Sequence, residues 1–326
     1  MIDRRLLLGG AAAGLLPTAP PLRAQPAGRP ARIGYLSSRP GPNEFEQAFE
    51  RGLRERGLSP GSQVVIDYRF AGFDAERENT NIAAMLASRP DVIVVTDGLV
   101  TRSPRSLGQV APVVVPAFGD PVASGATSSL ARPDGNMTGT AVFNVELSRK
   151  RLALLKQAVP GLQHAAALFN GRRRTKPAGV AVSLQAGEAI GVKVTELGLA
   201  LPEGLADGLA QAVRQGVQGV AILSDTATIT HRAAICDATL ALKLPTIFAN
   251  RTYLRAGGLM SYGPDVEGAF QRSAYFVDRI LKGAKPADLP IEQATTFQLV
   301  LNQRTARALG IRFPQPLLIL ADEVID

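Results

Sequence analysis

Small polar and charged residues follow nearly every apolar strand that the sequence predicts. Side chains of this kind donate and accept hydrogen bonds or carry a single charge, which suits the recognition of a small polar ligand. The same residue types cap the helices that follow such strands, so each position alone also has a purely structural explanation. In chain order the candidates are Ser37, Ser38, Asp97, Gly98, Gly119, Asp120, Asn170, Ser224, Asp225, Asn250 and Arg251.

Catalytic motifs are missing from the sequence. It has no G-x-G-x-x-G, no G-x-x-x-x-G-K-[ST] and no G-x-S-x-G pattern. The two histidines, His164 and His231, do not have the spacing of metal ligands. The single cysteine, Cys236, cannot form an internal disulfide and is expected to be a buried, small apolar residue. We therefore expect no cofactor, no metal and no enzymatic activity.

The elements that must position the polar residues alternate between strands and helices. Asp91–Thr96 contains four consecutive apolar β-branched residues, which is typical of a strand buried on both faces of a parallel sheet. Phe45, Phe49 and Leu53 recur on one helical face, with Asn43 as the expected N-cap. Two such series, separated in the chain, predict an α/β fold with two doubly wound parallel-sheet lobes. Ligands of open α/β sheets bind beyond the carboxyl ends of the strands, where the candidates lie.

The N-terminus has the pattern of an export signal. Arg4 and Arg5 precede an apolar run from Leu6 to Leu16, and a proline-rich stretch follows that ends in Leu22-Arg23-Ala24. The paired arginines resemble a twin-arginine signal, and a general secretion signal is the alternative. Residues 1–24 are therefore expected to be removed, and the protein is expected in the periplasm.

The net charge of the chain is +8. Such a charge is compatible with nucleic acid or a membrane surface as partner. However, the basic residues are scattered, aromatic residues are not interleaved with them, and an exported protein seldom meets nucleic acid. No nucleic-acid partner is expected.

Several stretches together resemble the substrate-binding proteins of bacterial ABC transporters, in the family that includes tryptophan- and aromatic-amino-acid-binding members. The resemblance implies a type I periplasmic-binding fold, in which three crossovers form a hinge between two lobes that close on a ligand. It also implies that Ser261 and Tyr262 lie at or near the cleft, where Tyr262 could pack on the ligand or fill the core under the hinge. The stretches are IGYLS at 33–37, FERGLRERG at 49–57, DVIVV at 91–95, GDPVASG at 119–125, SLARPDGNMTG at 129–139, AGGLMSYG at 256–263, VDRILKGAKPADLPIEQ at 277–293 and ADEVID at 321–326.

The sequence differs from many family members at two loops. Asp97-Gly98-Leu99 replaces a Gly-Thr-type loop, and Asn170 is followed by Gly171 and three arginines instead of proline. Asp97 could pair with an amine of the ligand, and an arginine of 172–174 with a carboxylate. The alternative is that the arginines form a solvated loop.

The resemblance predicts lobe 1 from 31–143 and 256–288, and lobe 2 from 144–255 and 289–326. It predicts a periplasmic, monomeric protein that binds a small polar solute, an amino acid or related carboxylate, and delivers it to an inner-membrane permease. A protein that feeds a sensor kinase is the alternative. Two other classes are disfavoured. A repressor would need an N-terminal helix-turn-helix, and an enzyme would need a nucleophile–base pair or a metal site.

Overall fold

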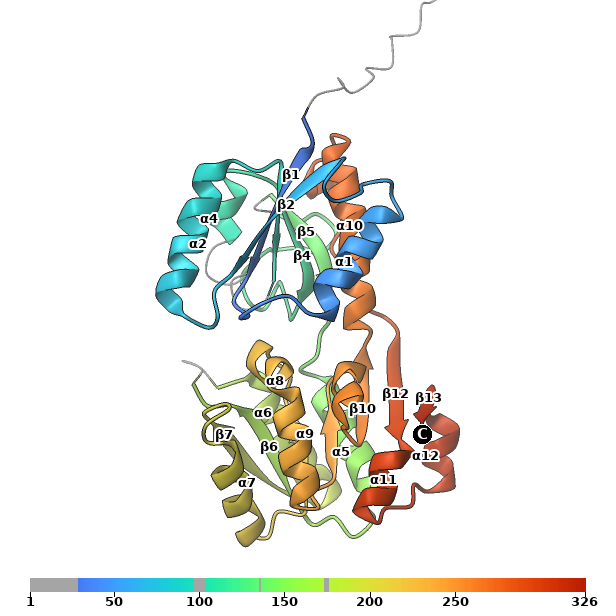
Figure 1. Cartoon of the computed structure of the whole chain (residues 1–326). Coiled ribbons are helices and arrows are strands. Elements are labelled where there is room, and N and C mark those ends of the chain that lie inside the picture. The colour runs from blue at the N-terminus through green and yellow to red at the C-terminus, as the bar shows by residue number, and fades with distance from the viewer. Residues whose placement is uncertain (1–28, 97–103, 135, 173–175) are drawn as a thin grey trace, which may run out of the picture.

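The first lobe is built on a parallel six-stranded sheet in the order β11-β5-β4-β3-β1-β2. The computed structural model describes residues 29–96, 104–134, 136–172 and 176–326, and Figure 1 shows its two lobes. The elements of this lobe are β1 (Ala31–Ser37), α1 (Glu44–Arg54), β2 (Val64–Phe70), α2 (Ala75–Ser88), β3 (Val92–Val95), α4 (Pro104–Gly108), β4 (Val113–Phe118), β5 (Met137–Ala141), α10 (Val266–Leu281), η2 (Pro286–Asp288) and β11 (Glu292–Gln293).

The second lobe has a seven-stranded sheet in the order β13-β12-β10-β9-β8-β6-β7, in which only the β10–β12 pair is antiparallel. Its elements are α5 (Leu147–Ala158), β6 (His164–Asn170), α6 (Ala178–Ile190), β7 (Lys193–Leu199), α7 (Leu205–Arg214), β8 (Gly219–Ile222), α8 (Thr226–Thr230), α9 (Arg232–Ala241), β9 (Thr246–Phe248), η1 (Arg251–Ala256), β10 (Met260–Pro264), β12 (Phe297–Asn302), α11 (Gln303–Leu309), α12 (Gln315–Leu320) and β13 (Glu323–Ile325).

Both faces of each sheet are covered, as the apolar runs predicted. In β3, Val92 and Val94 belong to the core shared with α1 and α10, while Ile93 and Val95 belong to the core shared with α2 and α4. Alternate residues of a strand point to opposite faces, so only a strand buried on both sides carries four apolar residues in succession. This arrangement confirms the predicted two-lobed α/β fold class.

Local signals set the helix that borders the cleft. The Asn43 side chain accepts a hydrogen bond from the Phe45 N–H at 2.9 Å, and the Glu46 carboxylate accepts one from the Asn43 N–H at 2.8 Å. This capping box satisfies donors at the N-terminus of α1 and confirms Asn43 as its N-cap. It also fixes Phe45 and Glu46 at the lobe edge that faces the second lobe.

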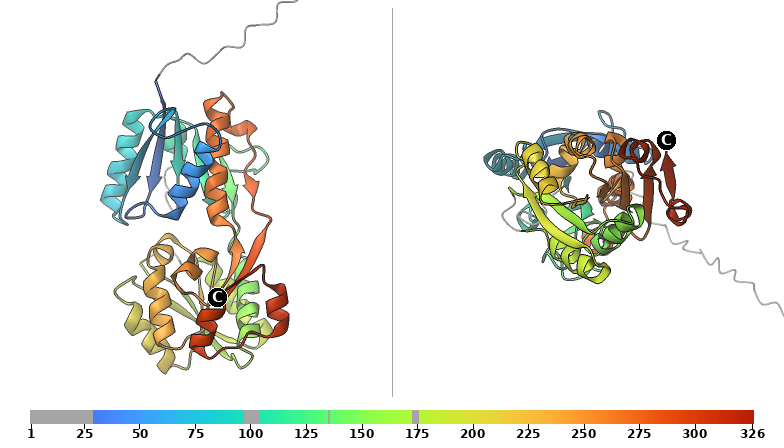
Figure 2. Two further views of the ribbon diagram at one scale, coloured as in Figure 1. Left: turned by 45° about the vertical axis from the view of Figure 1, so that its right-hand side comes forward. Right: turned by 90° about the horizontal axis from the view of Figure 1, so that it is seen from below.

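Three crossovers join the lobes and are visible as parallel connections in Figure 2. They run from β5 to α5, from β10 to α10 and from β11 to β12. The second crossover therefore follows Pro264, and the third lies between Gln293 and Phe297.

This corrects the boundaries drawn from the sequence. The prediction that residues 256–263 return the chain to lobe 1 is wrong, because Met260 pairs with Ile247 and Leu301 in the second sheet. Residues 289–293 belong to the first lobe instead, since Glu292 pairs with Thr140. A sequence pattern predicts that a strand exists, whereas the sheet that the strand joins is decided by partners far away in the chain.

Helices in the described part of the chain are too short or too polar to cross a bilayer.

Candidate ligand-binding site

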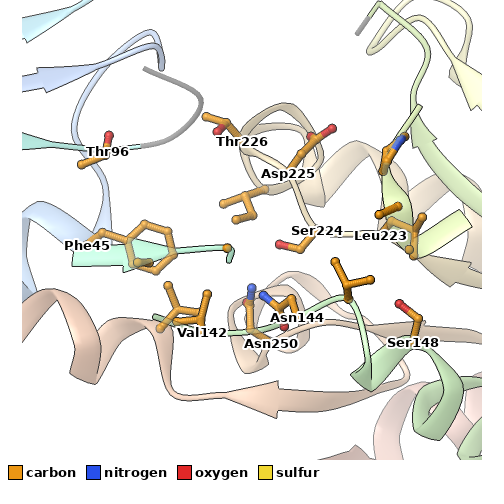
Figure 3. Close-up of a pocket in the computed structure, with 18 of the residues that line it drawn as sticks. Phe45, Thr96, Val142, Asn144, Ser148, Leu223, Ser224, Asp225, Thr226 and Asn250 are labelled. Atoms are coloured by element: carbon orange, nitrogen blue, oxygen red, sulfur yellow. The ribbon is translucent and has the colours of Figure 1, made fainter. Parts of the chain in front are cut away.

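A cavity of about 370 Å³ lies between the lobes, and both lobes contribute to its lining. Ligand sites in proteins typically enclose roughly 300–1,000 Å³, so this volume suits a small solute. Figure 3 shows Phe45, Val142 and Thr96 on the side of the first lobe and Leu223, Ser224 and Asp225 on the side of the second. The remaining lining residues are Arg39, Ala117, Gly119, Asn144, Val145, Ser148, Arg151, Pro177, Ala178, Gly179, Thr226, Ile229, Asn250, Val266 and Phe270.

The first lobe gives the cavity an aromatic wall. Phe45 of α1 and Phe270 of α10 stack with ring centroids 4.7 Å apart and an interplanar angle of 15°. Val266, one turn before Phe270, lines the same side. Both helices belong to one core cluster, so this wall is an extension of the lobe's own packing.

A buried, neutralised arginine lies beside that wall. The Arg39 guanidinium carbon is 5.6 Å from the centroid of the Phe45 ring. Its two terminal nitrogens pair with the carboxylate of Glu46, and its Nε donates to the Ser37 hydroxyl at 3.2 Å. Glu46 also accepts a hydrogen bond from the Tyr35 hydroxyl at 2.5 Å. The charge of Arg39 is thus balanced within the protein.

A second buried arginine, Arg151 of α5, lies at the hinge. Its Nε donates to the Tyr262 carbonyl at 2.7 Å, and its terminal nitrogens donate to the carbonyl and side-chain oxygens of Asn144 at 3.2 and 2.8 Å. Asn144 belongs to the first crossover, and Tyr262 lies on the strand that leads into the second. Burial lowers the pKa of Arg151 to about 10, because desolvation penalises its charge.

Asn250, which follows β9, presents an amide to the cavity. Its Oδ1 accepts the Thr252 N–H at 3.1 Å, and its Nδ2 is buried without a hydrogen-bond partner among the described residues. In Figure 3 this nitrogen points into the space between the labelled side chains.

Four of the residues proposed from the sequence line the cavity: Gly119, Ser224, Asp225 and Asn250. Asp225 is also the N-cap of α8, where its Oδ1 accepts the Thr228 N–H at 2.8 Å. Asp225 therefore both caps a helix and lines the cavity.

The other described candidates do not line the cavity. Asp120, next to Gly119, accepts hydrogen bonds from the N–H groups of Val122 and Ala123 and so caps a turn. Asn170 caps the Arg172 N–H, and Arg251 pairs with Glu323 at 2.7 Å.

Four further candidates lie outside the cavity lining. The Ser37 hydroxyl holds Arg39, and the Ser38 carbonyl accepts the Phe73 N–H at 2.7 Å. Ser261 is buried with a hydroxyl that has no partner in the described chain, and Tyr262 holds Arg151 through its carbonyl. Asp97 and Gly98, like the arginines at 173 and 174, lie outside the described residues. Arg172 is exposed and pairs with Glu203 at 2.9 Å.

Sequence reasoning missed Arg39, Phe45 as a cavity residue, Asn144, Ser148 and Arg151. One signal was available for Arg151. It shares the buried side of α5 with Leu152, Leu155 and Ala158, so it is a cation on a largely apolar helical face.

The lobes touch beside the cavity. Arg232 of the second lobe pairs with Glu44 of the first at 3.0 Å, and Arg255 pairs with Glu267 at 2.8 Å. Ile229 of α8 packs against the core of the first lobe. These contacts join the two lobes beside the cavity.

No group of three or more His, Cys, Asp or Glu side chains suited to a metal occurs within the described residues. The cavity offers hydrogen bonds, charge and an apolar wall. Two α/β lobes joined by three crossovers around such a cavity define a hinged small-molecule-binding protein.

Comparison with known proteins gives the family. The family model described as "ABC transporter substrate binding protein" matches residues 33–325, and the chain belongs to that family of solute-binding proteins. It is 19% identical over 281 residues to a tyrosine-binding protein of Clostridioides difficile. The alignment covers 86% of this chain and 80% of that protein.

Solved structures agree with the fold. An ABC domain from Streptococcus pneumoniae in complex with L-Trp superposes with a TM-score of 0.79 at 24% identity, covering 91% of this chain and all of that chain. A conserved domain protein from Vibrio cholerae gives a TM-score of 0.77 at 22% identity, with the same coverage.

Proposed function

We propose that the protein is the periplasmic solute-binding component of an ABC import system, and that it traps an amino acid or a related carboxylate between its lobes. The closed form would then dock on an inner-membrane permease. The observation that carries this proposal is the cavity of about 370 Å³ that both lobes line. The tyrosine-binding relative and the L-Trp complex support an amino acid as ligand.

The cavity supports binding without chemistry. Among its charged side chains, Arg39 pairs with Glu46 and Asp225 caps α8, and no histidine or cysteine lines it within the described residues. We therefore assign it no catalytic role. The protein acts as a monomer in this proposal, because one chain supplies both walls of the site.

A thermal-shift screen tests the binding function. The purified protein is stripped of copurified ligand by unfolding and refolding, and is then screened against aromatic, branched and acidic amino acids, keto acids, aromatic carboxylates and sugars. A ligand that binds only the folded state stabilises it by about 2.7 kcal/mol at a hundredfold excess over its Kd. A shift with one chemical class supports the proposal, and no shift with any class contradicts it.

The transport role needs its own test. Uptake of the solute found in the screen is measured in cells with and without the gene for this protein. Loss of uptake supports delivery to a permease. Unchanged uptake together with tight binding would instead favour a role in sensing.

A further inference from the structure

We propose that Arg151 and Asn250 form the subsite that receives a carboxylate of the ligand, and that the cavity therefore selects carboxylates over neutral solutes. This inference rests on the proposed solute-binding function and specifies its ligand class. It also replaces the arginine loop at 172–174 as the expected partner of the carboxylate.

The first observation is the charge of Arg151. Its side chain is buried, with the residue only 3% exposed, and its three contacts are all to neutral oxygens of Asn144 and Tyr262. Among the described residues no carboxylate pairs with it. A buried cation without a counterion is costly, and an arriving carboxylate offsets that cost.

The guanidinium also has donors left. It carries five N–H groups, and the contacts to Asn144 and Tyr262 use one N–H from each nitrogen. Each terminal nitrogen keeps a second N–H, and Arg151 lines the cavity. These two N–H groups can each donate a charge-assisted hydrogen bond to a carboxylate oxygen.

Arg39 shows the contrast within the same cavity. It is equally buried, but the Glu46 carboxylate neutralises it in the protein. Of the two buried arginines that line the cavity, only Arg151 lacks an acidic partner among the described residues.

Asn250 is the second, independent observation. The residue is 2% exposed, and its orientation is set because Oδ1 accepts the Thr252 N–H. Its Nδ2 donors consequently face the cavity without a partner in the described chain, which is costly for a buried amide. The guanidinium of Arg151 and the amide of Asn250 both have unpaired N–H donors at this cavity, and these donors require an acceptor. A carboxylate supplies acceptor oxygens together with the negative charge that Arg151 lacks as a partner.

The position of Arg151 also connects the ligand to the hinge. Its contacts hold Asn144 of the first crossover and Tyr262 before the second. A carboxylate bound to Arg151 is therefore joined to two of the three connections between the lobes.

The experiment compares each acid with its amide. L-Tryptophan, L-tyrosine, L-leucine and phenylacetate are titrated calorimetrically into the stripped protein beside L-tryptophanamide, L-tyrosinamide, L-leucinamide and phenylacetamide, with D-ribose and D-xylose as neutral solutes. We expect at least one acid to bind, and its amide to bind about tenfold more weakly or worse. An amide that binds as well as its acid, or binding of sugars only, overturns the inference while solute binding stands. No binding by any probe counts against the proposed function itself.

Substitution then locates the subsite. Asn250→Asp keeps the oxygen that caps Thr252 and replaces only the Nδ2 donors by a second carboxylate oxygen. It is expected to fold and to lose at least tenfold in affinity for the acid. The matched control is Asn302→Asp, because Asn302 is also buried and caps the Thr305 N–H at 3.0 Å outside the cavity lining. Equal affinity in the Asn250 variant, the control and the wild type overturns the inference.

Arg151→Met provides a second variant that removes the charge and keeps the length of the side chain. We expect it to lose the preference for acid over amide, even if the weakened hinge also lowers the melting temperature. A variant that stays folded and keeps that preference contradicts the assignment.

Discussion

Arg232 on α9 of the second lobe donates a hydrogen bond to Glu44 at the N-terminus of α1 in the first lobe, with 3.0 Å between Nη2 and Oε2. The two side chains come from different lobes and are 25% and 15% exposed. Screening by salt and water makes most surface ion pairs weak, and the partial burial of these two side chains limits that screening. The contact joins the two lobes, so we expect it to break when they separate.

Breaking this pair should destabilise the closed form. Arg232→Gln is expected to weaken ligand binding about two- to tenfold, because a partly buried pair contributes on the order of 1 kcal/mol. The effect should fall mainly on dissociation, which stopped-flow measurement resolves. The tightest ligand of the thermal-shift screen serves as the probe.

Arg54→Gln is the control for that measurement. Arg54 pairs with Glu50 at 2.7 Å within the same lobe, so its loss leaves the contact between lobes intact. If both variants release ligand at the wild-type rate, the ion pair between Arg232 and Glu44 does not hold the lobes together.

Gly263 should tolerate no side chain. A Cβ at this position would lie 1.8 Å from the Ala249 carbonyl oxygen and 3.3 Å from a terminal nitrogen of Arg151. The obstacle is backbone, so β10 would have to move away from β9. Gly263→Ala is expected to lower the free energy of unfolding by about 1–3 kcal/mol, measured by urea titration.

Gly161→Ala in the same lobe tests that explanation. A Cβ there meets nothing within 4 Å, so the same chemical change should leave stability within about 0.5 kcal/mol. Similar losses in both variants would mean that the close approach at Gly263 is not the cause.

The positions of helices and strands were predictable because they depend on patterns among neighbouring residues. The sheet that a strand joins was less predictable because it depends on residues far apart in the chain. The apolar run of β3 and the capping box at Asn43 are properties of a few neighbouring residues, and both are present in the structure. The sheet to which β10 belongs depends on Ile247 and Leu301, which no short window contains. The hinge boundaries drawn from the sequence were displaced for this reason.

The site was predictable in part for a similar reason. Strand ends did lead to Ser224, Asp225 and Asn250. Asp120 has the same kind of position, yet its carboxylate is turned to the N–H groups of its own loop. Arg151 was missed because a charged residue on a helix is usually solvated, and its burial depends on the two crossovers that fold over it.

The carboxyl group of Asp134 should make the folded protein lose stability as the pH falls below about 4. Hydrogen bonds from the Thr127 hydroxyl, at 2.6 Å, and from the Ser128 N–H and hydroxyl lower the pKa of this carboxyl to about 2. A lowered carboxyl pKa stabilises the fold above the ordinary value near 4, and the contribution disappears as the pH falls toward 2. Asp134→Asn should therefore be less stable than wild type at pH 7, and the difference should shrink between pH 4 and pH 2 in urea titrations.

Asp288→Asn is the control for this pH dependence. Asp288 is exposed and has no side-chain hydrogen bond in the described chain, so its loss should leave the pH profile unchanged. A gap between Asp134→Asn and wild type that stays constant from pH 7 to pH 2 would contradict the role of the carboxylate.

Cys236 should report unfolding of the second lobe. Its side chain is 3% exposed in the core beside Tyr253, as the sequence predicted, and burial raises the pKa of the thiol to about 12. Because only the thiolate attacks disulfide reagents, the folded protein should show almost no reaction with Ellman's reagent at pH 8, and the urea-unfolded chain should release one equivalent. A ligand that closes the lobes should slow labelling further by lowering the population of open states. Rapid labelling of the native protein would show that this core opens far more often than its packing implies, whereas Cys236→Ala should give no signal in either state.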